Sequence, residues 1–428
     1  MHRLFGIMVI LLLVAGCAST GGSTGPHAGR GPAAVNKVTG SGAEPIIRVL
    51  VLSSSGSATV ASTGSVKVTG GGGATLLSSS RGGTVSIART ARGLQVRVAA
   101  SGESVDSPAA VVIDAGAAPL SVGGVWYSGR VLARPNDSNG IDLINLVPLE
   151  TYLEGVVPYE IGEPGPDGYA AVEAQTVAAR TYALSRMNLN RDQPFDVESG
   201  VMDQVYRGRE KQSRLASSAV QETRGLVLSY RGALCDAYYS ATCGGHTSDI
   251  RTVWPDRPDA PFLHGSLDRP SGGTASFCAD AKNFRWCYSF SGHALGNTLR
   301  QTLPALLNVP ASSVGELVDM RIAQRTQSGR VWQLEIRTSS GTYNVQGDKI
   351  RRALMLDVQK GRILPSTMFD FDKHMSGDRL ASVDIVGGGN GHGVGMCQNG
   401  AIGMAKRGYA YDMILQHYYP GSELRAGY

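Results

Sequence analysis

The stretch AVEAQTVAARTYAL, residues 171–184, decides the central element of the fold. Alanine and valine recur in it every three or four residues, which is the spacing of one face of a helix. We therefore expect a helix from about Tyr169 to Met187, with Asp167 or Gly168 at its N-cap. Because alanine side chains are small, another element can approach this helix closely.

A single glutamate stands among apolar residues shortly before this helix, in the stretch VPYEIG, residues 157–162. A short helix is expected at 148–155, so we predict that Glu160 lies off both helices, at their junction, where a cleft can form. Apolar neighbours disfavour the charged form of a carboxyl group and raise its pKa, as a general acid at neutral pH requires. A structural ion pair with Arg180 is the alternative.

Short runs of alternating residues precede these helices, and each is bounded by glycine, serine or other turn residues. This is the pattern of half-buried strands, and 136–140 has the composition of a turn. We expect a β-rich region at 45–142, with a structural or binding role because it lacks charged and aromatic clusters. The expected strands are 47–52, 65–68, 84–87, 94–98, 125–132 and 141–146.

The N-terminal residues have the pattern of an export signal. A charged start is followed by a short apolar run and then by small residues up to Cys17. We interpret 1–16 as a lipoprotein signal peptide and Cys17 as the lipidated residue. Residues 17–44 are rich in glycine and serine and are expected to form a flexible tether. The protein is thus predicted to be exported and lipid-anchored in the cell envelope, in the periplasm or at an outer membrane if one is present.

Composition excludes few functions. The formal net charge of +5 over 428 residues is too small to indicate nucleic-acid binding. It suits an anionic polymer or a membrane surface equally well. The chain is long enough for one large domain or two smaller ones.

Glycine is densest in GGGNGHGVGMCQNGA, residues 387–401. Such glycines adopt backbone angles closed to other residues or let the backbone approach a ligand. No Walker lysine follows, which argues against a phosphate loop. We expect the glycines to frame His392 and Gln398 as cleft residues, followed by helices at 398–407 and 411–418.

Several motifs occur in a fixed order and together resemble the SpoIID/LytB family. They are VPLETYLEGVVPYEIG, AVEAQTVAARTYAL, DQVYRG, YYSATCGGHT, ILPSTMFD and GHGVGMCQNGAIGMAKRGYAYDMILQHYYPG. The resemblance covers 143–428 and implies a mixed helix and strand domain with a cleft, with an insertion that contains cysteines at about 235–290. The whole chain is therefore expected to be α+β.

The resemblance implies one of two activities. Sporulation protein D of this family is a lytic transglycosylase that acts on peptide-free peptidoglycan glycan strands, and Glu160 matches its catalytic glutamate. Other members enhance a wall amidase without cleaving glycan. A single carboxyl group suffices for the first activity, which needs no cofactor, although Glu163 or Asp167 could complete a hydrolytic pair with Glu160.

Further residues in these motifs are candidates for binding the glycan. Arg180 could hold a lactyl carboxylate or orient Glu160, and the ring of Tyr182 could contact a sugar or belong to the core. Gln204 and Tyr206 lie in a loop with the same two interpretations. Trp254 and Trp286 could likewise stack on glycan or form a small core.

The cysteines allow a metal site or disulfides. Cys243 and His246 are spaced to share a metal, which Cys278 and Cys287 could complete as a structural zinc site. The alternative is a pair of disulfides, Cys278 with Cys287 and Cys235 with Cys243, which leaves Cys397 free. A zinc-dependent amidase is a third function, but no HExxH-like spacing supports it.

Overall fold

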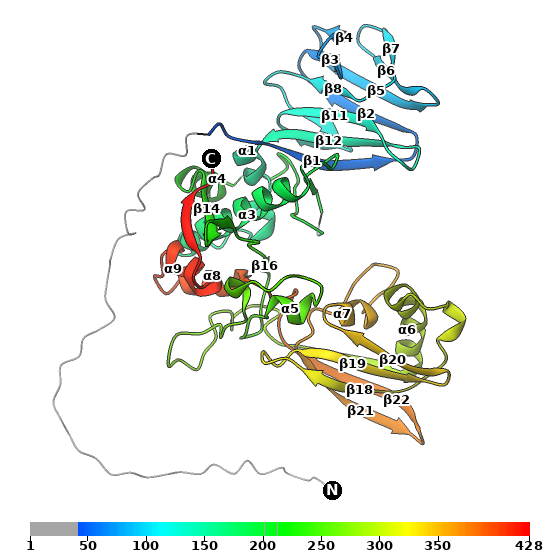
Figure 1. Ribbon diagram of the computed structural model, residues 1–428, viewed down its shortest axis with the longest axis vertical. Coiled ribbons are helices and arrows are strands. Elements are labelled where there is room, and N and C mark those ends of the chain that lie inside the picture. Colours follow the sequence, from blue (N-terminus) through cyan, green and yellow to red (C-terminus); the bar gives the residue numbers. More distant parts are fainter. Residues whose placement is uncertain (1–41, 201, 212) are drawn as a thin grey trace, which may run out of the picture. The chain divides into compact units, whose positions relative to one another are not determined.

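The computed structural model describes residues 42–200, 202–211 and 213–428. The predicted signal peptide, the lipidation of Cys17 and most of the tether lie outside these residues. Helices and strands both occur along the described chain (Figure 1), so the predicted α+β class is confirmed. No helix within the described ranges is long and apolar enough to cross a membrane.

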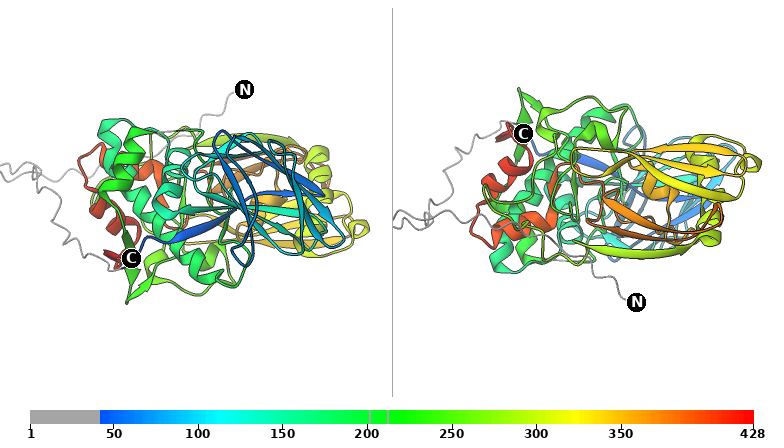
Figure 2. Two further views of the ribbon diagram at one scale, coloured as in Figure 1. Left: turned by 90° about the horizontal axis from the view of Figure 1, so that it is seen from above. Right: turned by 90° about the horizontal axis from the view of Figure 1, so that it is seen from below.

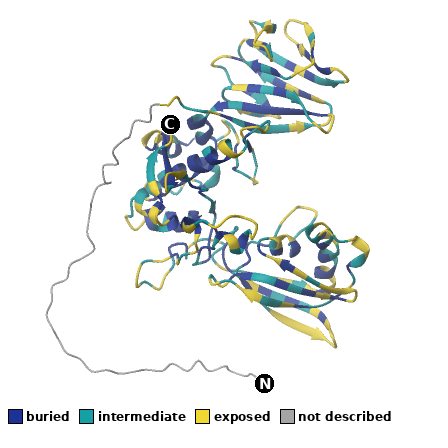
Figure 3. Ribbon diagram, viewed as in Figure 1, coloured by how far each residue is buried: buried dark blue, intermediate teal, exposed yellow. Residues whose placement is uncertain are grey.

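Two sheets make up the N-terminal region. Their strands are β1 (Ile46–Ser54), β2 (Ser57–Ser62), β3 (Val66–Gly70), β4 (Thr75–Ser79), β5 (Gly83–Thr90), β6 (Gly93–Val98), β7 (Ser104–Ser107), β8 (Val111–Asp114), β9 (Leu120–Val122), β10 (Val125–Tyr127), β11 (Arg130–Pro135), β12 (Ile141–Pro148) and β13 (Val197–Glu198). One sheet has the order β13-β1-β12-β11-β8-β3-β4 and the other β10-β9-β2-β5-β6-β7. Buried and exposed residues alternate along the strands (Figure 3), as the sequence predicts.

The predicted boundary between 142 and 143 falls inside a strand. β12 pairs with β1 from Ile141 to Pro148, so the N-terminal sheet continues to the start of the first helix. β13 comes from a later part of the chain and adds to β1 in parallel. The edge strand β13 follows the longest helix in the sequence. The sheet therefore contains strands from both the β-rich region and the helical region.

The helical region is built around the predicted central helix. Its elements are α1 (Leu149–Glu154), α2 (Val157–Glu160), α3 (Tyr169–Leu189), α4 (Arg214–Glu222), α8 (Gln398–Ala405), α9 (Tyr411–Tyr418), β14 (Leu226–Tyr230), β15 (Ala233–Leu234) and β24 (Glu423–Ala426). The helix α3 contacts α4, α8, α9 and β14 and is buried along most of its length (Figure 3). Alanines on all sides of α3 let these elements approach, so the prediction for this helix is confirmed.

Glu160 lies between α1 and α3, off both of the predicted helices and at their junction, although a one-turn helix that the sequence did not predict reaches it. Glu160 ends α2, a single turn between α1 and α3, and its N–H donates to the carbonyl of Val156 at 3.1 Å. Pro158 favours this turn because proline is pre-organised for the first positions of a helix.

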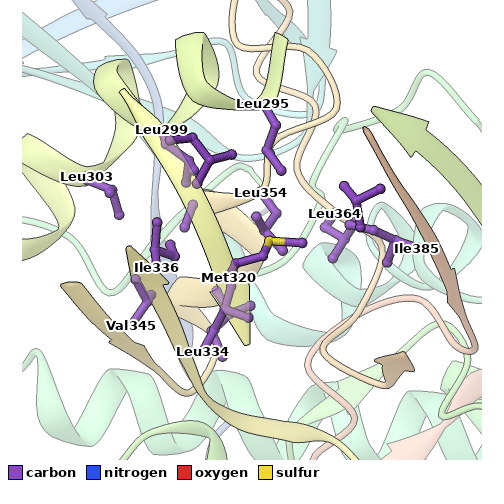
Figure 4. Packing of buried hydrophobic residues seen from close by; sticks show 14 of the residues in the cluster. Leu295, Leu299, Leu303, Met320, Leu334, Ile336, Val345, Leu354, Leu364 and Ile385 are labelled. Carbon is purple, nitrogen blue, oxygen red and sulfur yellow. The ribbon is translucent and has the colours of Figure 1, made fainter. Parts of the chain in front are cut away.

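Residues 286–387 form a unit with its own core. Its elements are β17 (Trp286–Ser291), α6 (Gly292–Leu307), β18 (Leu317–Arg325), β19 (Val331–Thr338), β20 (Gly341–Gln346), α7 (Lys349–Ala353), β21 (Phe369–Ser376) and β22 (Arg379–Gly387). Two three-stranded sheets, β18-β19-β20 and β17-β22-β21, lie side by side (Figure 2). Leucine, isoleucine and valine side chains from α6 and from both sheets pack together into one core (Figure 4). The predicted insertion at 235–290 overlaps this unit only at its first strand.

The glycine-rich stretch joins two distant motifs. β16 (Tyr239–Ser240) pairs in parallel with β23 (Met396–Cys397), next to the start of α8. Gly395 has a φ of 70°, and a Cβ there would lie 2.0 Å from the carbonyl oxygen of Tyr238. The expectation that these glycines permit unusual backbone angles and close approach is therefore confirmed.

Candidate active site

The carboxyl group of Glu160 lies between a backbone donor and a side-chain donor. Its Oε1 accepts the N–H of Val205 at 2.8 Å, and the side chain of Gln398 provides a second hydrogen bond. Burial raises the pKa of Glu160, and these two hydrogen bonds offset only part of that effect. The residue is thus biased toward the protonated form that a general acid needs.

Amide and phenol groups surround this carboxyl group. Gln398 Nε2 also donates to Gln175 Oε1 at 3.2 Å, which fixes its orientation. Gln204 Nε2 donates to the hydroxyl of Tyr239 at 2.8 Å. Burial and the charge of Glu160 raise the pKa of Tyr239 far above its usual range, so this hydroxyl stays protonated beside the carboxyl group. The structure thus brings Gln204 and Gln398 to Glu160.

Glu160 is a solitary carboxylate in its immediate surroundings. The groups that shift its pKa include no second carboxylate among the described residues. Glu163 and Asp167, the candidates for a hydrolytic pair, are both exposed on the loop before α3. Arg180, the predicted alternative partner of Glu160, pairs with Glu150 instead.

Tyr182 and His392 belong to a cluster of aromatic rings with Tyr238 and Trp254. The ring centroids of Tyr182 and Tyr238 are 5.9 Å apart, and those of Trp254 and His392 are 4.9 Å apart. The hydroxyl of Tyr182 donates at 2.8 Å to Asp203, which is the residue before Gln204. Burial lowers the pKa of His392 to about 4, so its ring is neutral. These rings pack on one another, and Trp254 lies with them.

Arg180 does not contact the site, contrary to the prediction that it binds substrate. Its side chain is fully buried, and it holds Glu150 through Nε and Nη2 at 2.9 and 2.8 Å. Its Nη1 donates to Thr223 and to the carbonyl of Leu226. Because its donor nitrogens are occupied inside the protein, Arg180 has a structural role between α1, α3 and β14.

Tyr206 is also a core residue, which corrects its predicted role in substrate binding. Only 1 % of its surface is exposed, and its hydroxyl donates to Asn145 at 2.9 Å. Its ring packs against Tyr127 and Tyr152, with centroids 5.5 and 4.8 Å away. Tyr206 therefore anchors the loop that carries Val205 to the N-terminal sheets.

Three cysteines and one aspartate form a second buried group. Donor atoms of Cys243, Cys278, Cys397 and Asp268 all lie within 4.8 Å of one another. The sulfurs of Cys243 and Cys278 are 3.8 Å apart. The hydroxyl of Tyr418 donates to Asp268 Oδ1 at 2.6 Å. Hydrogen bonds from Cys243 and then Cys397 lower the pKa of Cys278. Three thiol sulfurs and a carboxylate suit a tetrahedral zinc ion.

This group differs from both predictions for the cysteines. His246 Nδ1 lies 2.7 Å from the carbonyl of Thr247, and His246 is not part of the group. Cys287 is exposed on β17, and the described cysteines form no disulfide. Cys243 and Cys278 were therefore correctly placed near each other, whereas His246 and Cys287 were not.

Sequence reasoning missed three residues that matter here. Tyr239 lies in the motif YYSATCGGHT, but nothing in that motif predicts that its hydroxyl lies near Glu160. Asp268 and Cys397 reach the cysteine group from distant segments, so spacing along the chain could not reveal them. The pairing of β16 with β23 brings Cys397 to the motif that carries Cys243, and a hydrogen bond from Asp268 N–H to the carbonyl of Gly245 brings in Asp268.

Comparison with known families gives two matches. The family described as Stage II sporulation protein, SpoIID, matches residues 137–230, which include Glu160 and Gln204. A domain of unknown function, DUF8618, matches residues 274–395, which cover the unit at 286–387.

Three relatives extend these matches. An uncharacterized protein of Brachyspira hyodysenteriae is 31 % identical over 71 % of this chain and 74 % of its own. The chain belongs to the SpoIID/LytB family. The Stage II sporulation protein D of Bacillus subtilis is 26 % identical over 76 % of this chain and 87 % of its own. The amidase enhancer of the same organism is 27 % identical over 64 % of this chain, which spans 40 % of that relative.

Proposed function

We propose that this member of the SpoIID/LytB family serves its cell-wall related function by cleaving peptidoglycan glycan strands as a lytic transglycosylase. The observation that carries the proposal is that Glu160 is solitary and half-buried, and that this burial raises its pKa. Ordinary glycosidases use two carboxyl groups, whereas this reaction needs one.

The proposed reaction uses Glu160 twice. Its carboxyl proton passes to the oxygen that joins N-acetylmuramic acid to the next sugar, and the bond from that oxygen to the anomeric carbon breaks. The resulting carboxylate then accepts the proton of the muramyl C6 hydroxyl, whose oxygen bonds to the anomeric carbon. The products are a strand with a 1,6-anhydromuramyl end and a strand with a free hydroxyl, and Glu160 is protonated again. Val205 N–H and Gln398 stabilise the carboxylate between the two transfers.

Product analysis tests this proposal directly. Peptide-free glycan strands are incubated with the protein, with Glu160→Gln and with Glu163→Gln, and the ends are identified by mass spectrometry. We expect anhydromuramyl ends from the protein and from Glu163→Gln, and a loss of about 10²–10⁴-fold in rate for Glu160→Gln. Glu163 is an exposed carboxylate close in sequence and so serves as the matched control. Reducing ends, or equal activity of Glu160→Gln, would contradict the proposal.

A second function is a wall-binding protein that enhances an N-acetylmuramoyl-L-alanine amidase. The similarity to the amidase enhancer of Bacillus subtilis favours it. In that case no cleavage occurs, and Glu160→Gln stimulates the amidase as well as the unchanged protein does. The partner is then the amidase together with peptidoglycan.

For the buried cysteine group we propose a structural zinc ion held by Cys243, Cys278, Cys397 and Asp268. The ion would balance the buried thiolates and tie the segment at 268–278 to the two motifs that carry the other cysteines. It takes no part in the reaction at Glu160.

Metal analysis of the purified protein tests the zinc site. We expect one zinc ion per chain, lost in Cys278→Ser and kept in Cys287→Ser, since Cys287 is exposed and outside the group. Chelation should lower the unfolding temperature of the protein but not that of Cys278→Ser. A full zinc content in Cys278→Ser would contradict this ligand set.

The N-terminal sequence also supports a proposal for the location of the protein. We propose that residues 1–16 direct export and that Cys17 carries a lipid anchor in the cell envelope. Replacement of Cys17 by Ser, followed by separation of membrane and soluble fractions, tests the anchor.

A further inference from the structure

An open depression lies between the N-terminal sheets and the loop that follows Gln204. It has a volume of about 650 Å³ and is lined by Thr63, Pro119, Trp126, Arg209 and Glu210. Trp126 is 37 % exposed, so part of this large apolar side chain is open to solvent. The depression therefore presents an aromatic face and a cation to solvent.

The hairpin of β9 and β10 fixes the direction of Trp126. Gly123 and Gly124 form its two-residue turn, both with positive φ, as such turns require. Neighbouring residues of a strand point to opposite faces, so Tyr127 turns inward to pack on Tyr206 while Trp126 turns outward. The hairpin is thus anchored to the loop that carries Val205.

Arg209 and Glu210, in the loop that follows Gln204, line the other side of the depression. Arg209 N–H donates to the carbonyl of Trp126 at 2.8 Å. Gly208 passes so close that a Cβ on it would lie 2.3 Å from the same carbonyl oxygen. Arg209 and Trp126 therefore keep a fixed spacing.

The loop at 205–211 connects this depression with the surroundings of Glu160, because Val205 N–H donates to Glu160 and Arg209 lines the depression. Tyr159 precedes Glu160 and interacts with Glu210, which also lines the depression. Lys211 lies 5.8 Å from the centre of the Tyr159 ring and donates to the carbonyl of Pro158 at 2.9 Å. The loop at 205–211 therefore contacts both the turn that carries Glu160 and the strand that carries Trp126.

We propose that Trp126 and Arg209 form a distal subsite for the same glycan strand that Glu160 cleaves. Sugar rings have apolar faces that pack on an indole ring. A strand without stem peptides carries a free lactyl carboxylate on each muramyl residue, which suits the guanidinium of Arg209 in the lining of the depression. The N-terminal sheets then select long strands over short ones. This inference rests on the proposed function for its ligand, a peptide-free glycan strand.

Binding measurements with an inactive protein test the subsite separately from cleavage. Glu160→Gln and the double variant Glu160→Gln/Trp126→Ala are titrated calorimetrically with strands of one disaccharide and of many disaccharides. We expect the double variant to bind long strands about tenfold more weakly and single disaccharides equally well. Trp126→Tyr in place of Trp126→Ala should restore most of the affinity, because it keeps an aromatic face. Met375→Ala, an exposed apolar residue on β21, is the matched control and should change neither affinity.

The outcomes separate the subsite from the reaction. Equal binding of long strands by both variants overturns the subsite, even if the unchanged protein makes anhydromuramyl ends. It would then assign Trp126 to a protein partner if the same substitution abolished amidase stimulation. A selective loss on long strands supports the subsite, even if the unchanged protein cleaves nothing.

Discussion

Glu150 and Glu160 lie in consecutive short helices, yet their surroundings differ. Glu150 is buried and receives two hydrogen bonds from Arg180 and one from the N–H of Gly225. Glu160 is half-buried and receives only neutral donors, Val205 N–H and Gln398. A paired cation satisfies a carboxylate permanently, whereas neutral donors leave it able to exchange a proton. The comparison shows that two carboxyl groups close in sequence differ in the charge beside them, and that difference suits Glu150 to a structural role and Glu160 to the proposed proton transfer.

Removing the cation from the first carboxylate should have the largest effect. Arg180→Met leaves the buried Glu150 unpaired and is expected to lower the free energy of unfolding by about 3–5 kcal/mol. Urea unfolding measures this loss, and the double variant Glu150→Gln/Arg180→Met should recover part of it. A loss below about 1 kcal/mol for Arg180→Met would show that the ion pair does not hold α1, α3 and β14 together.

Weakening a neutral donor at the second carboxylate should change the pH profile of cleavage. The proposed cleavage requires protonated Glu160, so its rate is expected to fall as the pH rises through the pKa of Glu160. Gln398→Leu removes a hydrogen bond that lowers this pKa, and the fall should therefore move to higher pH. Gln301→Leu, an exposed change on α6, is the control and should leave the profile where it was. A fall at lower pH in Gln398→Leu would contradict the role of Gln398.

The smallest expected effect is on the stability of Glu160→Gln. A raised folded-state pKa means that protonation of Glu160 favours the folded state, and that this contribution is lost as the pH rises through the folded pKa. The variant should thus be slightly more stable than the protein at pH 7. The difference should vanish near pH 4, close to the pKa of an unfolded glutamate of about 4.3. Equal stability across this range, measured by thermal unfolding, would mean that burial of Glu160 costs nothing.

Local patterns in the sequence predicted much of the fold. The alanine spacing gave α3, and the alternating runs gave β1, β3, β5 and β6 within a few residues. The apolar neighbours of Glu160 also predicted its raised pKa correctly, because those neighbours are close in sequence. Features that depend on adjacent residues were therefore readable from the chain alone.

Features that depend on contacts between distant segments could not be predicted from the sequence. Arg180 was assigned to Glu160 because nothing in the sequence distinguishes that carboxylate from Glu150. The cysteine group combines Cys243 with Cys397 through the pairing of β16 with β23, and with Asp268 through backbone contacts of the segment at 267–268. The unit at 286–387 was missed because its core joins α6 to strands on both sides of it.

The pairing of β16 with β23 also sets when the candidate site can exist. Gln398 follows β23 directly, so the hydrogen bond that it gives Glu160 comes from a segment that is synthesised long after the glutamate. A ribosome-bound or prematurely terminated chain carries the glutamate without the segment that orients it. The site is therefore assembled late in biosynthesis, and fragments that end before β23 should contain Glu160 without its Gln398 partner.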